Sequence, residues 1–174
     1  MQKNKIKKIV MKANAISLAN YFVGRAVAEQ VDVLQLSLMK RVYIAHGFCL
    51  AIFDRSALDP RFDVVEAWKY GPVIPSVYHS FKHNRKNPII EESVIINVDP
   101  KTYGIDWETP KLTDIDIIKV ADVIWNRYLD FSDSQLVELT HRQGTPWGMC
   151  YQPGKTCIIP DEYTKAFYKK LIKR

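Results

Sequence analysis

Several residues and patterns that define common function classes are scarce or missing in this 174-residue chain. Its three cysteines cannot pair fully within one chain, so we expect reduced thiols rather than the disulfide framework of a secreted protein. The sequence contains no C-x-x-C pair, Walker loop, G-x-G-x-x-G turn, G-x-S-x-G elbow or H-E-x-x-H helix. These absences disfavour a zinc ribbon, a nucleotide-binding fold and the common hydrolase families, and we expect no cofactor.

Long apolar runs are also missing. No run approaches the roughly 18 residues that a membrane helix needs, so we expect no membrane partner. Residues 1–12 are basic, yet they lack the apolar stretch and cleavage site of a signal peptide. Together with the reduced thiols, these features predict a cytoplasmic protein.

The composition is that of one ordinary globular domain, with 47% hydrophobic and 25% charged residues. The net charge of +6 is concentrated at the two ends of the chain. Residues 1–12 hold five lysines and no acid, and residues 161–174 hold five basic and two acidic side chains. The body between them is nearly neutral, so we do not expect a nucleic-acid partner despite the basic balance.

Apolar residues that recur at steps of three and four predict a mainly helical fold. The predicted helices span residues 13–30, 34–53, 75–83, 113–127, 132–141 and 160–172. The predicted N-caps are Asn14 for the first helix, Thr113 for the fourth, and Ser132 or Asp133 for the fifth. Strands are predicted at 64–68 and 89–98, whereas 101–110 and 142–155 are expected to be loops. The predicted fold is mainly α: a compact single-domain helical bundle with a small β element, formed by residues 13–174 behind a basic tail at 1–12.

Two histidines and two cysteines are candidate metal ligands. His79 and His83 stand four residues apart on a predicted helix, a spacing that allows both imidazoles to face one ion. Cys150 and Cys157 are the other candidates. A third ligand at recognisable spacing is missing, so we favour two polar positions on an exposed helix face.

Other polar side chains were weighed for catalysis. His46 lies in the apolar second helix and is expected to be a hydrogen-bonded core histidine. His141 is placed at a helix end, where it can interact with terminal carbonyls, although it could also act as a base for Cys150. Glu66 needs a partner if it is buried, and we expect a backbone amide or a histidine. An enzymatic function of these groups stays open as an alternative.

Rigid aromatic turns are the densest feature of the sequence. Residues 66–75 read EAWKYGPVIP. Gly71 can adopt backbone angles that are closed to other residues, and Pro72 fixes φ and lacks an N–H donor. Pro146 and Trp147 form a second pair of proline and aromatic residue. Rigid exposed aromatics suit a protein-binding hot spot, whereas buried tryptophans would be core anchors. Both interpretations remain open at this point.

An ordered set of residues resembles the Panacea domain, the SocA-like antitoxin domain that is also met in phage-associated proteins. The resemblance covers about residues 14–172. The matching residues are Leu36, Met39, Lys40, Tyr43, Ala45, His46, Gly47, Glu66, Ala67, Trp68, Tyr70, Gly71, Pro72, Val73, Pro75, Tyr78, His141, Pro146 and Trp147.

The resemblance implies a non-enzymatic antitoxin that neutralises a toxin encoded beside it, and in some members an energy-dependent protease is a further partner. Many members carry a DNA-binding module, for which residues 1–12 are too few. The expected toxin-binding residues are Tyr70, Gly71, Pro72, Val73, Pro75, Tyr78, His141, Pro146 and Trp147. The alternative is a proteolytic adaptor or mobile-element protein that binds host machinery without a cognate toxin. The oligomeric state is not predicted.

Overall fold

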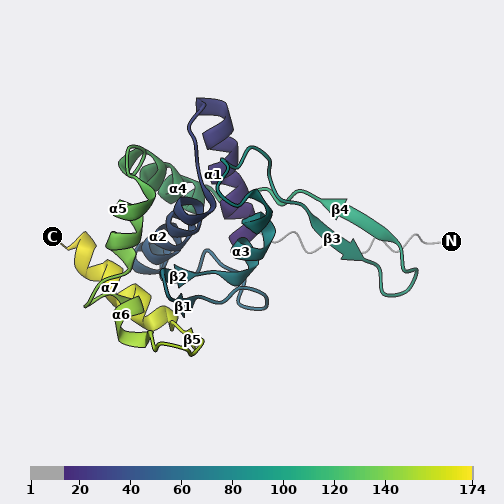
Figure 1. The fold of residues 1–174 in the computed structure, drawn as a ribbon. Coiled ribbons are helices and arrows are strands. Elements are labelled where there is room, and N and C mark those ends of the chain that lie inside the picture. The colour runs from purple at the N-terminus through teal and green to yellow at the C-terminus, as the bar shows by residue number, and fades with distance from the viewer. Residues whose placement is uncertain (1–13, 174) are drawn as a thin grey trace.

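The computed structural model describes residues 14–173, so the predicted basic tail at residues 1–12 lies outside the described part of the chain. The fold within this range is mainly α, as the sequence predicted (Figure 1). Its helices are α1 (Ala15–Glu29), α2 (Gln35–Phe53), α3 (Pro75–Phe81), α4 (Ile115–Arg127), α5 (Asp133–Thr140), α6 (Pro146–Cys150) and α7 (Asp161–Ile172). A 3-10 turn, η1 (Lys82–Asn84), extends α3.

Two small antiparallel sheets complete the fold. The first has the strand order β2 (Gly71–Val73), β1 (Glu66–Trp68) and β5 (Cys157–Ile158), so that a tight hairpin is joined by a strand from the far end of the chain. The second is the hairpin of β3 (Ile95–Val98) and β4 (Ile105–Glu108). This second hairpin projects beyond the helical body (Figure 1).

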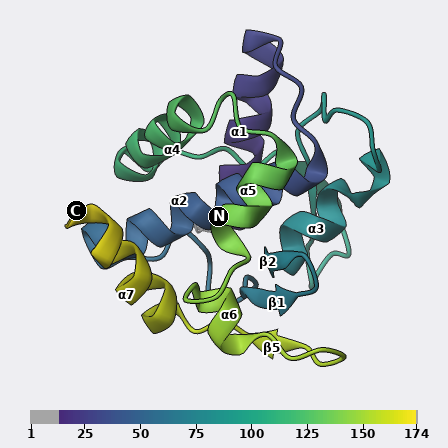
Figure 2. The same cartoon turned by 60° about the vertical axis from the view of Figure 1, so that its left-hand side comes forward.

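Helix α2 is the centre of the molecule. It packs against α1, α4, α5 and α7, and Figure 2 shows it running through the middle of the helical body. By length and composition α2 could cross a membrane, so the expectation that no such run exists was wrong. The physical reason is its position: 78% of the apolar window is buried, because neighbouring helices enclose it and leave little need for a polar face.

A glycine sets the distance between α2 and α7. A Cβ added to Gly47 would lie 2.3 Å from a ring carbon of Tyr168, so only a residue without a side chain allows this approach. The Tyr168 ring then packs edge-on against Tyr43 and Phe48, with centroid distances of 6.1 and 4.9 Å. Gly47 therefore serves the packing of the core.

Helix starts follow the predicted capping in two of three cases. Asn14 and Ser132 cap α1 and α5, each in a reciprocal box with the residue three positions later. Helix α4 was expected to be capped by Thr113, and this was wrong. The cap is Asp114, whose carboxylate accepts from the backbone N–H groups of Asp116 and Ile117.

Two predicted loops contain regular structure. Residues 101–110 include β4, and residues 142–155 include α6. The first was missed because the alternation of apolar and polar residues in β4 is only four residues long, and its pairing with β3, as in Ile96 opposite Trp107, joins residues on either side of a turn. The second was missed because five residues are too few for helical periodicity, although Thr145 caps α6 and Pro146 starts it.

Candidate protein-binding site at the Gly-Pro hairpin

The hairpin of β1 and β2 has a two-residue turn, Lys69 and Tyr70, between the paired residues Trp68 and Gly71. Gly71 has a φ of +100°, a region that L side chains rarely adopt. A Cβ at this position would also lie 2.8 Å from Nζ of Lys40. The sequence places glycine here for two reasons, backbone angle and space.

Three side chains hold the backbone of this hairpin, and we call them the carbonyl clamps. Lys40 of α2 donates from Nζ to the carbonyl of Pro72 at 2.9 Å. His141, at the end of α5, bonds through Nε2 to the carbonyl of Lys69 at 2.8 Å. Trp147 of α6 donates from Nε1 to the carbonyl of Trp68 at 2.7 Å. Because a carbonyl only accepts, Nε2 of His141 carries the proton.

Two of the clamps also contact each other. The ring centroids of His141 and Trp147 lie 3.8 Å apart with the rings tilted by 38°, and Tyr151 stacks on Trp147 at 4.7 Å. Trp147 and Pro146 are both buried. Of the two interpretations that the sequence left open for Trp147, the structure supports the core anchor.

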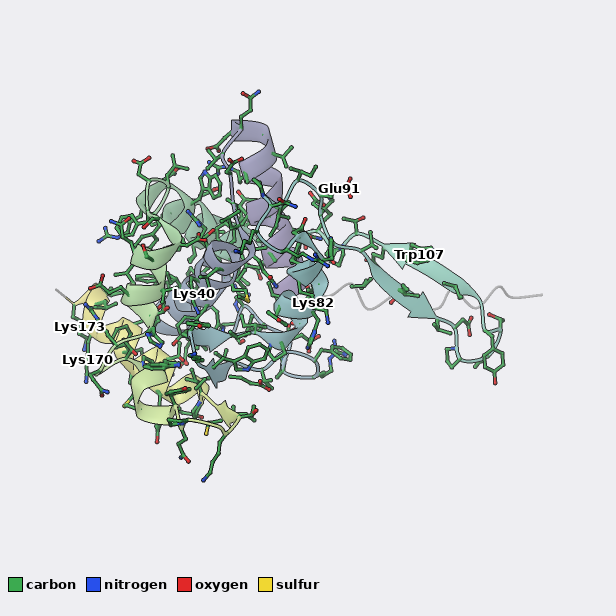
Figure 3. The ribbon with its side chains drawn as sticks, in the orientation of Figure 1. Lys40, Lys82, Glu91, Trp107, Lys170 and Lys173 are labelled. Atoms are coloured by element: carbon green, nitrogen blue, oxygen red, sulfur yellow. The ribbon has the colours of Figure 1, made fainter. Side chains whose placement is uncertain are left out.

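Lys40 is a fully buried lysine at the base of the hairpin (Figure 3). Burial lowers the pKa of its ammonium group to about 7, because the charged form loses its hydration. The carbonyl of Pro72 is the hydrogen-bond partner of Nζ. At neutral pH the charged and the neutral forms of the Lys40 amine are therefore similarly populated.

Beside the hairpin lies a cavity of about 500 Å³, which we call the hollow. Its lining combines Leu34, Gln35, Leu36 and Met39 from the start of α2, Trp68, Lys69, Tyr70 and Val73 from the hairpin, Tyr78 of α3, and Arg85, Lys86 and Asp133. Most of the lining surface is apolar. The charged residues are three basic groups and one acidic group, so the edge of the hollow favours an acidic neighbour.

Hydrogen bonds fix the aromatic wall of the hollow. The indole of Trp68 donates to Oε2 of Glu66 at 2.7 Å and packs edge-on against Tyr78 at 4.9 Å. Gln35 donates to the carbonyl of Tyr78 at 2.9 Å. Glu66 is half-buried, and its partner is an indole rather than the backbone amide or histidine that we expected.

The residues expected to bind a toxin divide into two groups. Gly71, Pro72, Pro146 and Trp147 are buried, and His141 is half-buried and holds the turn. On the outer side, Tyr70 is 62% exposed. Val73 and Tyr78 line the hollow, while Pro75 opens α3 and is half-buried.

Sequence reasoning did not assign several lining residues to the site. Leu36 and Met39 stand three positions apart in the matching set and share a face of α2, which was a usable signal. Arg85 and Lys86 follow η1, and nothing in their local pattern pointed to the hollow.

The other candidate reactive groups lie outside the hollow. His46 is buried, with Nε2 3.1 Å from Oδ1 of Asp161, so it is the hydrogen-bonded core histidine that we predicted. Burial raises the pKa of the Cys150 thiol, the opposite of what a nucleophile needs. His79 and His83 are exposed, and across residues 14–173 no three potential ligands stand together as a metal site.

The fold and the site define a helical domain with a clamped turn and an apolar hollow beside it. A family model described as "Antitoxin SocA-like, Panacea domain" matches residues 38–148, a range that contains all three clamps. The chain is also 31% identical over 134 residues to Antitoxin SocA of Caulobacter vibrioides (strain NA1000 / CB15N). The aligned residues make up 77% of this chain and 68% of that protein. No solved structure matches. The chain belongs to the SocA-like antitoxin family.

Proposed function

We propose that this protein is a non-enzymatic cytoplasmic antitoxin that neutralises a protein toxin by direct contact through the hollow and the exposed turn at Tyr70. The observation that carries this proposal is the set of carbonyl clamps. They fix the backbone of a turn whose side chains face solvent. A turn that is ordered before binding loses little conformational entropy on association.

The chemistry of the surface supports a protein partner. Tyr70 is exposed, and Nζ of Lys69 lies 5.2 Å from the centroid of its ring. Trp68 and Tyr78 present aromatic surface in the wall of the hollow. Tyrosine and tryptophan dominate binding hot spots, especially where a pocket can exclude water.

The partner surface that fits is an apolar side chain with acidic neighbours. The hollow has room for one or two such side chains, while Lys69, Arg85 and Lys86 stand exposed at its edge. Charge complementarity at an interface edge mainly raises the association rate and selects the partner. Delivery of the bound toxin to a protease would need a further surface and is separate from this proposal.

Co-expression with the product of the adjacent gene tests the proposal. The unsubstituted protein should rescue growth and co-purify with that product, and Tyr70→Ala or the double variant Arg85→Glu/Lys86→Glu should weaken both. Tyr163→Ala is the matched control, because Tyr163 is an exposed tyrosine of α7 outside the hollow.

If the unsubstituted protein neither rescues growth nor co-purifies with that product, the proposal is overturned. Capture of a host protease or another host factor without any toxin would instead support the adaptor function. Equal losses for Tyr70→Ala and Tyr163→Ala would show that binding does not use the hollow.

A further inference from the structure

The projecting hairpin of β3 and β4, which we call the arm, has one apolar face. Pairing places Ile96 opposite Trp107 and Val98 opposite Ile105. Positions two apart on a strand share a face, so these four side chains point to the same side. Each is between 55% and 64% exposed, and Figure 3 shows Trp107 on the arm, outside the helical body.

The charges of the arm lie off this face. Asp106 and Asn97 form one pair on the opposite face, and Glu108 pairs there with Ile95. Asp99 belongs to the turn, where its carboxylate accepts from the backbone N–H groups of Lys101 and Thr102. The apolar face itself is therefore neutral, the opposite face carries the carboxylates of Asp106 and Glu108, and the tip holds one charge of each sign, Asp99 and Lys101.

A two-stranded hairpin that projects into solvent lacks the cover that such a unit normally needs. Hairpins gain independent stability from further strands or from packing of one face against another element. Within the described chain the arm's element-level packing is between its own two strands. The apolar face is therefore left largely exposed by the helices and strands of residues 14–173.

The chemistry of the face selects an apolar sheet as the cover. A basic protein would find its complementary charges on the opposite face rather than here, and an anionic bilayer would be repelled by strands whose charged residues, Asp106 and Glu108, are both acidic. A second copy of the same face is neutral and equally apolar. Stacking the two leaves both acidic faces in solvent.

We infer that two copies of this chain pair through their arms, with Ile96, Val98, Ile105 and Trp107 of each copy packed face to face in a four-stranded sandwich. Two such faces stack roughly 10 Å apart. The projection of the arm from the body keeps the two helical domains from colliding (Figure 1).

The available area sets the strength of this pairing. Side chains of this size at half exposure offer on the order of 100 Å² each, so two faces of four side chains bury roughly 800 Å². This value is below the roughly 1,000 Å² of a stable specific interface, so we expect a weak, reversible dimer with a dissociation constant on the order of micromolar.

Sedimentation velocity of the full chain tests the inference. The protein should change from 20.2 kDa toward twice that mass as its concentration rises from about 1 to 200 µM. Ile105→Thr and Trp107→Thr should each weaken the dimer by roughly tenfold or more, because threonine keeps strand propensity and removes apolar surface. Ile158→Thr is the matched control, an isoleucine on β5 that is 61% exposed.

A second measurement uses the unsubstituted protein and does not depend on how a variant folds. Trp125 and Trp147 are buried and Trp68 is half-buried, so Trp107 is the most exposed indole. Acrylamide quenching of tryptophan fluorescence should therefore fall as the protein concentration rises.

Three results would overturn the inference: a 20.2 kDa species across the whole range, a dimer that Ile105→Thr and Trp107→Thr leave intact, or a dimer that dissociates when salt is raised. The last result would indicate pairing by charge, since screening should leave an apolar contact intact and reduce repulsion between acidic arms. Because the hollow and the arm are different surfaces, either proposal can fail without the other.

Discussion

Replacing Lys40 with methionine should flatten the dependence of stability on pH between pH 7 and about pH 8.5. Methionine keeps a long unbranched chain and removes the ammonium group. The substitution also leaves the Pro72 carbonyl without its Lys40 donor, which costs about 1–3 kcal/mol. The change of stability with pH is therefore the informative quantity, rather than stability at one pH.

The size of the effect follows from the pKa. Burial lowers the pKa of Lys40 from 10.5 to about 7, so between these values the unfolded chain binds more protons than the folded one. The free energy of unfolding must then rise with pH above about 7 and stay level below it, as far as this group is concerned. At about 1.4 kcal/mol per pH unit, the gain from pH 7 to 8.5 is about 2 kcal/mol.

Urea unfolding followed by far-ultraviolet circular dichroism at each pH measures this gain. The upper limit avoids Cys49, whose burial raises the pKa of its thiol from 9.0 to about 12 and lowers stability at higher pH. Lys82→Met is the control, because Lys82 is exposed. If the Lys40→Met protein gains as much stability with pH as the unsubstituted protein, Lys40 is not the titrating group and the argument from burial is refuted.

Three further substitutions test the packing. Gly47→Ala should lower the free energy of unfolding by about 1–3 kcal/mol, since its Cβ would overlap the ring of Tyr168, and thermal unfolding would show the loss. Gly71→Ala should cost more than Gly154→Ala in urea unfolding. Both have positive φ, but a Cβ at Gly154 meets no atom within 4 Å, so equal losses would exclude the steric part of the argument. Trp147→Phe should cost about 1–3 kcal/mol in urea unfolding by leaving the carbonyl of Trp68 without its donor, and an unchanged stability would show that this clamp does not matter.

The helices were predictable because their signals are local. Apolar periodicity located α2, and the capping residue Asn14 marked the start of α1. The strand β4 carried only a short signal, the alternation of apolar and polar residues from Ile105 to Glu108, and its pairing with β3 bridges a turn. The helices were predicted because their signals lie within a few neighbouring residues. The strand β4 was missed because it depends on pairing with another segment of the chain.

The candidate site was predictable only as a set of residue types. The rigid turn at Gly71 was visible in the sequence, but its partners were not. Trp147 reaches the carbonyl of Trp68 across 79 positions, and His141 reaches that of Lys69 across 72. Contacts from side chain to backbone leave no trace in the identity of the accepting residue.

That last property has a consequence for how such a domain can diversify. Every amino acid carries a carbonyl, so the clamps constrain the path of the turn but not the side chains at Lys69 and Tyr70. Substitutions at these two positions can therefore change what the turn presents while its shape is retained. Under the proposed function, a lineage could therefore exchange one binding partner for another through these two positions without rebuilding its core.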